Sequence, residues 1–138
     1  MTKKNIIFYF RDYLNIWHFY SKSFQEHLLF NLMTGMQDSA KITQVESDQK
    51  TYMMALERYR TLAGQYPSDQ QGLMALVDRP TTAPRPRKWS SMMDRLKEDP
   101  WGNPYIYKFP GSKKKNQPEI ISWGEDGLEG TVDDLSSQ

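Results

Sequence analysis

Hydrophobic residues near the N-terminus follow a helical spacing. Apolar and aromatic side chains recur there every three or four positions, which draws one stripe along a helix. The stripe consists of Phe10, Tyr13, Leu14, Trp17, Tyr20, Phe24 and Leu28. Charged residues such as Arg11 and Lys22 interrupt it, so the segment lacks the roughly 20 mostly apolar residues of a membrane span. We expect residues 1–30 to form an aromatic, amphipathic helix that packs on a partner or on the domain, or that lies on a membrane surface.

A second helical pattern covers residues 31–63. Its apolar positions are Leu32, Met36, Ala40, Val45, Tyr52, Leu56, Tyr59 and Leu62. The stretch contains no proline, and Gly64 follows it directly. Because glycine accepts the left-handed conformation with which many helices end, we expect this helix to stop at Ala63.

The next segment, "YPSDQQGLMALVDRP", predicts a short helix. Ser68 and Gln71 have the spacing of a capping box, in which each side chain bonds the backbone N–H of the other residue. The apolar face of this helix is Leu73, Leu76 and Val77, and Pro80 ends it. The proline-rich stretch that follows predicts a loop, and a third helical turn is expected at residues 92–96.

Two strands are expected near the C-terminus. "YIYKF" and "EIISW" are rich in β-branched and aromatic residues, and "PGSKKKNQP" between them suits a hairpin connection. Helices come first and strands last, which predicts an α+β fold: a long N-terminal helix, then a short helix, a loop and a small antiparallel β-sheet.

Composition narrows the possible functions. The chain has 138 residues and a net charge of +1, so we expect one domain of ordinary size and no nucleic-acid partner. Its basic runs lie in loops flanked by proline or glycine and are expected to be solvated surface charge. There is no cysteine, and the two histidines, His18 and His27, are too far apart to be helical neighbours. These absences disfavour a catalytic triad that uses histidine, and they also disfavour a zinc site.

The acidic residues are concentrated in "GEDGLEGTVDD", residues 124–134, which holds five of the chain's 17 carboxylates. Such a run is either a solvated acidic tail or a set of carboxylates that converge on a cation. Composition alone leaves both interpretations open.

Several strings, in this order, resemble one known family. "ALERYRTLAGQYPSDQQGLMALVDRPT", "LKEDPWGNPYIYKFPG" and "IISWGEDGLEGTVDD" are similar to the major pseudopilin of bacterial type II secretion systems, a type IV pilin-like protein. The resemblance covers residues 31–134. It implies a helix at residues 31–63 and a globular head at residues 64–138, and a structural subunit rather than an enzyme.

The family's known role supplies further expectations. Its subunits associate with themselves and with other pseudopilins, act with inner-membrane components of the secretion system, and polymerise into a periplasmic pseudopilus. The resemblance therefore implies an inner-membrane protein with a periplasmic head. In the string "DPWGNPY" we expect Pro100, Gly102 and Pro104 to make a tight turn, with Asp99 bonding backbone N–H groups ahead of it.

The resemblance also bears on the acidic stretch. The family holds one Ca²⁺ in the loop after its last strand. Carried over by position, the side-chain ligands are Asp126, Asp133 and Asp134, and the backbone carbonyl ligands are those of Trp123 and Leu128. Hard carboxylate and carbonyl oxygens suit calcium.

Residues 1–30 depart from the family pattern. The family begins with a basic leader, a cleaved glycine and a long apolar helix opened by glutamate, whereas no glycine precedes Gly35 in this sequence. We expect no processing by the prepilin peptidase, and this segment does not support the family's membrane anchor. The alternative is a pilin-like binding module that docks on a partner or membrane surface through this helix and stays outside a filament.

Overall fold

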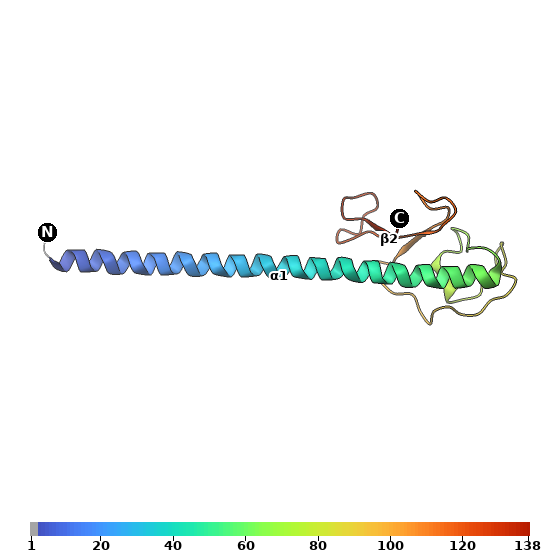
Figure 1. The fold of residues 1–138 in the computed structure, drawn as a ribbon, viewed down its shortest axis with the longest axis horizontal. Coiled ribbons are helices and arrows are strands. Elements are labelled where there is room, and N and C mark those ends of the chain that lie inside the picture. The colour runs from blue at the N-terminus through green and yellow to red at the C-terminus, as the bar shows by residue number, and fades with distance from the viewer. Residues whose placement is uncertain (1–2) are drawn as a thin grey trace. The chain divides into compact units, whose positions relative to one another are not determined.

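The computed structural model describes the backbone of residues 3–138 and the side chains of residues 21–22 and 24–138. One long helix precedes a small sheet (Figure 1). The elements are helix α1 at Lys3–Ala63, the 3₁₀ helix η1 at Leu73–Leu76, and strands β1 at Ile106–Lys108, β2 at Glu119–Ser122 and β3 at Leu135–Ser136. The predicted α+β fold is confirmed. The two helices expected at residues 1–30 and 31–63 are one helix, because no proline interrupts the sequence between them.

The chain divides by internal packing into residues 1–40 and 41–138. In the first unit, the apolar side chains described are at least half exposed: Phe24, Leu28, Leu29, Phe30, Leu32, Met33 and Met36. The other members of the predicted aromatic stripe lie outside the described side chains. Within the described residues, no helix combines the length and the hydropathy of a membrane span. The boundary expected after residue 30 stays a prediction based on composition.

Helix α1 ends where the sequence predicts. Gly64 has φ +90°, in the left-handed region, and its N–H donates to the Arg60 carbonyl at 2.8 Å. Arg60 also places a positive charge in the last turn, where the carbonyl end of the helix dipole favours it. The chain can therefore turn back along the helix after Ala63.

The capping box forms as expected. The backbone N–H of Gln71 donates to Ser68 Oγ at 3.2 Å, and the backbone N–H of Ser68 donates to Gln71 Oε1 at 3.0 Å. The element that follows is the single-turn η1, which buries Leu73 and Leu76 and leaves Val77 half-buried just beyond its end.

The helical turn expected at residues 92–96 was wrong. This segment has no helix. The backbone N–H groups of Met92 and Met93 instead both donate to the Leu76 carbonyl, at 2.8 and 3.2 Å. These bonds tie the segment to η1 in a non-helical conformation, which a spacing argument cannot foresee.

The sheet has the order β1-β2-β3, and both pairs are antiparallel. Ile121 in β2 lies opposite Ile106 in β1 and opposite Ser136 in β3. Strands β1 and β2 confirm the two predicted strands. Strand β3 was not predicted, because two residues after an acidic run carry no alternating pattern.

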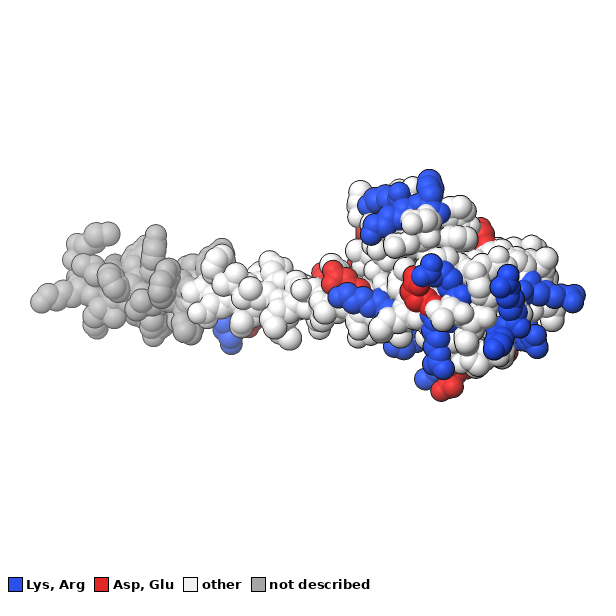
Figure 2. Space-filling view, turned by 45° about the vertical axis from the view of Figure 1, so that its right-hand side comes forward, with Lys and Arg blue, Asp and Glu red and all other residues white. Residues whose placement is uncertain are grey.

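The core of the second unit is made of buried side chains from α1, η1, β1 and β2; Figure 1 shows where these elements lie. Helix α1 contributes Val45, Tyr52, Leu56 and Tyr59, which are at most 1% exposed and follow a helical spacing. Tyr107 of β1 and Ile120 of β2 belong to the same core, as does Tyr105, which directly precedes β1. Figure 2 shows the basic side chains of this unit in several separate groups with acidic ones between them, as expected for solvated surface charge.

Candidate functional site

A buried carboxylate on α1 anchors the segments that lead to the candidate site. Asp48 is 3% exposed. Its oxygens accept hydrogen bonds from Lys97 Nζ at 2.8 Å, Gln44 Nε2 at 3.1 Å and the Tyr105 hydroxyl at 3.2 Å. Burial by itself raises the pKa of Asp48, but these bonds, with that of Lys97 foremost, outweigh burial and lower the pKa below its usual value.

Two more residues of α1 hold the chain around the site. The Tyr52 hydroxyl accepts from the Lys97 N–H at 2.7 Å and donates to the Lys97 carbonyl at 3.1 Å. The Gln49 amide donates to the carbonyls of Ile120 in β2 at 3.2 Å and Leu135 in β3 at 2.8 Å. The helix therefore fixes both the start of the turn that follows Lys97 and the strands β2 and β3.

The turn at residues 99–104 has the hydrogen bonds that its sequence predicts. Asp99 Oδ1 accepts from the backbone N–H groups of Trp101 at 3.0 Å and Asn103 at 2.8 Å. The backbone closes the turn as well, because Asp99 N–H donates to the Asn103 carbonyl at 2.8 Å. Gly102 has φ +89°, which a side chain would disfavour.

This turn is bonded to the acidic loop, which we define as residues 124–134. The Ser122 hydroxyl at the end of β2 donates to Asp99 Oδ2 at 2.6 Å and accepts from the Gly124 N–H at 3.2 Å. The Asn103 side-chain amide donates to the Gly124 carbonyl at 2.8 Å. The point where the loop begins is therefore held by two residues of the turn.

Inside the acidic loop, oxygens of three predicted ligand residues surround one hydroxyl. Thr131 Oγ1 lies 2.6 Å from Asp133 Oδ1, 3.2 Å from Asp126 Oδ1 and 3.2 Å from the Leu128 carbonyl oxygen. Hydrogen bonds to its carboxylate hold the pKa of Asp133 below its usual value; the bond from the Thr131 hydroxyl has the largest effect, and the bond from the Asp126 backbone N–H comes next. Sequence reasoning missed Thr131, because a threonine between glycine and valine carries no signal of its own.

The third predicted side-chain ligand, Asp134, is held differently. One of its oxygens, Oδ2, accepts from the Gly130 N–H at 2.8 Å. The other, Oδ1, is buried and has no hydrogen-bond partner. A buried carboxylate oxygen without a partner is costly, and a bound cation would satisfy it.

Close backbone packing at Gly124 also gives the loop a defined shape. A Cβ added there would lie 2.5 Å from both the carbonyl oxygen and Oδ2 of Asp133, and φ is +64°. The two ends of the loop therefore meet at a glycine. Glu129 forms an exposed ion pair with Lys108 at 2.8 Å and is not among the predicted ligands.

The described residues do not include three acidic or histidine side chains already arranged as a metal-binding group. The acidic loop brings together oxygens of Asp126, Asp133 and Leu128, and it leaves one oxygen of Asp134 unsatisfied. Its carboxylates bond neighbouring N–H and O–H groups, so a cation would recruit them by replacing some of those bonds. The donor set suits a hard ion such as Ca²⁺.

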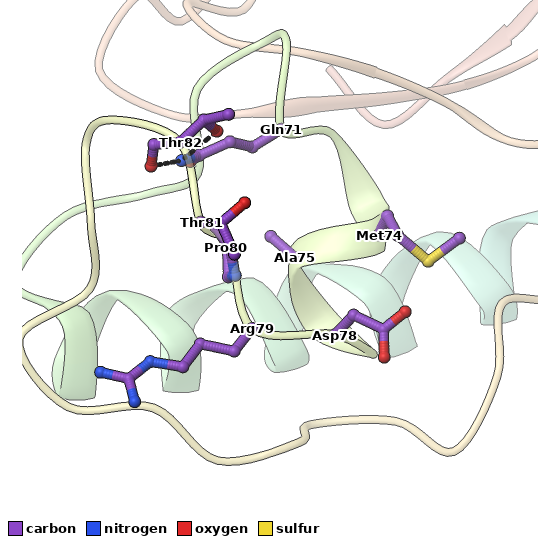
Figure 3. A pocket seen from close by; sticks show the side chains of 8 residues that line it. All are labelled: Gln71, Met74, Ala75, Asp78, Arg79, Pro80, Thr81 and Thr82. Atoms are coloured by element: carbon purple, nitrogen blue, oxygen red, sulfur yellow. Dashed lines mark hydrogen bonds between the residues drawn. The ribbon is translucent and has the colours of Figure 1, made fainter.

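A separate hollow of about 200 Å³ lies beside η1 and is drawn in Figure 3. The Gln71 amide at its rim is fully engaged, because its nitrogen donates to the Thr82 carbonyl and hydroxyl and to the Pro84 carbonyl. These bonds fasten the proline-rich loop, and the hollow has no arrangement of acid, base and nucleophile.

Comparison with known proteins assigns the family. A family model described as "Type II secretion system (T2SS), protein G" matches residues 32–137. The chain belongs to this family. A type II secretion system core protein G of Pseudomonas aeruginosa is 44% identical over 98 residues, which are 70% of this chain and 68% of that protein. The Aeromonas hydrophila protein of the same name is 41% identical over 109 residues, or 78% and 74% of the two chains.

A solved structure agrees. The crystal structure of the major pseudopilin from the type 2 secretion system of enterohaemorrhagic Escherichia coli superposes with a TM-score of 0.70 and 37% identity, over 75% of this chain and 91% of that one. The predicted resemblance is thus confirmed, as is the prediction of a secretion-system subunit rather than an enzyme. Membership of the protein G family does not favour the alternative of a binding module outside a filament. The calcium ligands stay a prediction.

Proposed function

We propose that this chain is a pseudopilus subunit: it self-associates, assembles with other pseudopilins, acts with the inner-membrane components of type II secretion, and exposes its second unit to the periplasm. The observation that carries this proposal is the match of residues 32–137 to the protein G family. The exposed apolar residues of α1 between Phe24 and Met36 add support, because such residues favour helix association.

A chimera tests the proposal. Residues 32–138 are placed after the N-terminal segment of the Pseudomonas aeruginosa relative and expressed in a strain that lacks that relative. We expect secretion into the medium to be restored, and the chimera to cross-link to itself. The same chimera with Tyr52→Asp, which puts an unpaired charge into the core, should do neither. A chimera that folds and accumulates but neither cross-links nor secretes would contradict the proposal.

We further propose that the acidic loop binds one Ca²⁺ through the carboxylates of Asp126, Asp133 and Asp134 and the backbone carbonyls of Trp123 and Leu128. Three observations support it. Oxygens of three of these residues lie around Thr131, Asp134 Oδ1 is buried without a partner, and Gly124 lets the loop ends meet. The ion would supply positive charge that offsets the repulsion among the carboxylates.

Thermal unfolding of the full chain in calcium or in EDTA tests this site. An ion that binds only the folded state stabilises it by about 2.7 kcal/mol at a free concentration a hundredfold above Kd. We expect calcium to raise the melting temperature. Asp133→Ala should remove most of that rise, and Glu129→Ala, which removes only an exposed ion pair, should leave it intact. Equal melting curves in calcium and EDTA, or equal stabilisation by magnesium, would show that the loop is an ordinary acidic segment.

A further inference from the structure

We propose that Asn103 is a positioning residue for the acidic loop: its side-chain amide holds the Gly124 carbonyl so that the loop leaves β2 in the direction that brings its ligand oxygens together. The part of this proposal that concerns calcium affinity rests on the proposed calcium site. The part that concerns the shape of the loop does not.

Asn103 is held firmly by its own turn. Its backbone N–H donates to Asp99 Oδ1 at 2.8 Å, and its carbonyl accepts from the Asp99 N–H, also at 2.8 Å. Asp99 is 5% exposed, so these bonds are shielded from water. The Asn103 side chain therefore projects from a fixed backbone, which is what a positioning group requires.

Asn103 reaches the loop at two places. Its Nδ2 donates to the Gly124 carbonyl at 2.8 Å, across 21 residues of sequence. A Cβ added to Gly127 would lie 3.1 Å from Asn103 Oδ1. The side chain thus bonds the loop before Glu125 and lies close to it after Asp126, and so bears directly on the path of the first predicted ligand.

Gly124 also packs against the other end of the loop. It packs so closely on Asp133 that no side chain fits between them. Its N–H is bonded to the Ser122 hydroxyl, which in turn donates to Asp99 Oδ2. Asp99 therefore supports both bonds to Gly124: one oxygen holds Asn103 and the other holds Ser122.

The measurements that test Asn103 are amide hydrogen exchange in EDTA and calcium affinity by calorimetry, both on the full chain. Asn103→Ala should speed exchange at residues 125–134 about tenfold and leave β1 and β2 unchanged. It should also weaken calcium binding about tenfold, equivalent to about 1.4 kcal/mol. Asn116→Ala removes an exposed asparagine from the hairpin connection and should change neither quantity.

A second variant guards against a cavity effect. Asn103→Asp keeps the shape of the side chain, removes the N–H donor and adds a negative charge beside the acidic loop, so in EDTA it should speed loop exchange at least as much as Asn103→Ala. Unchanged loop exchange in both variants would overturn the proposal, as would faster exchange spread equally over loop and strands with calcium affinity intact. If the unsubstituted chain binds no calcium but Asn103→Ala still loosens the loop in EDTA, the calcium site fails and the role of Asn103 in shaping the loop stands.

Discussion

The two buried tyrosines that face each other beside Asp48 allow a matched test of what fastens the turn to α1. Tyr52 and Tyr105 lie with their ring centroids 5.3 Å apart and their planes at 61°. Replacing either with phenylalanine keeps the ring and removes only the hydroxyl. Any difference between the two variants therefore measures hydrogen bonds and not packing.

The structure predicts unequal losses. The Tyr52 hydroxyl makes two bonds to the Lys97 backbone, at 2.7 and 3.1 Å. At about 1 kcal/mol of net stability each, Tyr52→Phe should cost roughly 2 kcal/mol. The Tyr105 hydroxyl makes one bond, at 3.2 Å, to Asp48, which keeps Lys97 and Gln44 as partners. Because this bond is long but is made to an ionised carboxylate, Tyr105→Phe should cost about 1.5 kcal/mol, the lower end of the range for bonds to charged groups.

Urea unfolding of the full chain, followed by tryptophan fluorescence, measures both. A pure change in stability moves the midpoint and leaves the slope m unchanged. For a unit of this size, roughly 2 kcal/mol corresponds to a fall in melting temperature of about 8 to 16 °C. A loss below about 0.5 kcal/mol for Tyr52→Phe, or a larger loss for Tyr105→Phe than for Tyr52→Phe, would refute the reasoning that the Lys97 backbone is the main attachment.

Two further outcomes are expected. The folded state lowers the pKa of Asp48. This carboxylate therefore stabilises the fold above its unfolded pKa of about 3.9, and the contribution is lost as pH falls through the lower folded pKa. Urea midpoints should fall more steeply in acid for the unsubstituted chain than for Asp48→Asn. Gly124→Ala should destabilise the protein by about 1 to 3 kcal/mol more than Gly102→Ala. Both glycines have positive φ, but only at Gly124 would an added Cβ collide with Asp133. Equal melting temperatures for the two variants would count against this close packing.

Much of this protein follows from local patterns. The spacing of Val45, Tyr52, Leu56 and Tyr59 predicted the buried face of α1, and Gly64 predicted its end. The capping box and the turn after Asp99 were also predicted, because their hydrogen bonds join residues two to four positions apart. Interactions at that range are set by residue type and spacing, which are visible in the sequence.

Tertiary structure decided the remainder. The segment expected to be helical at residues 92–96 is instead non-helical and bonded to the Leu76 carbonyl, and pairing with β2 made a strand of Leu135 and Ser136. The bond between Asn103 and Gly124 spans 21 residues, and neither residue carries a local signal of the other. Such contacts depend on the path of the whole chain, because a distant donor or acceptor competes for backbone groups that local propensity alone would assign elsewhere.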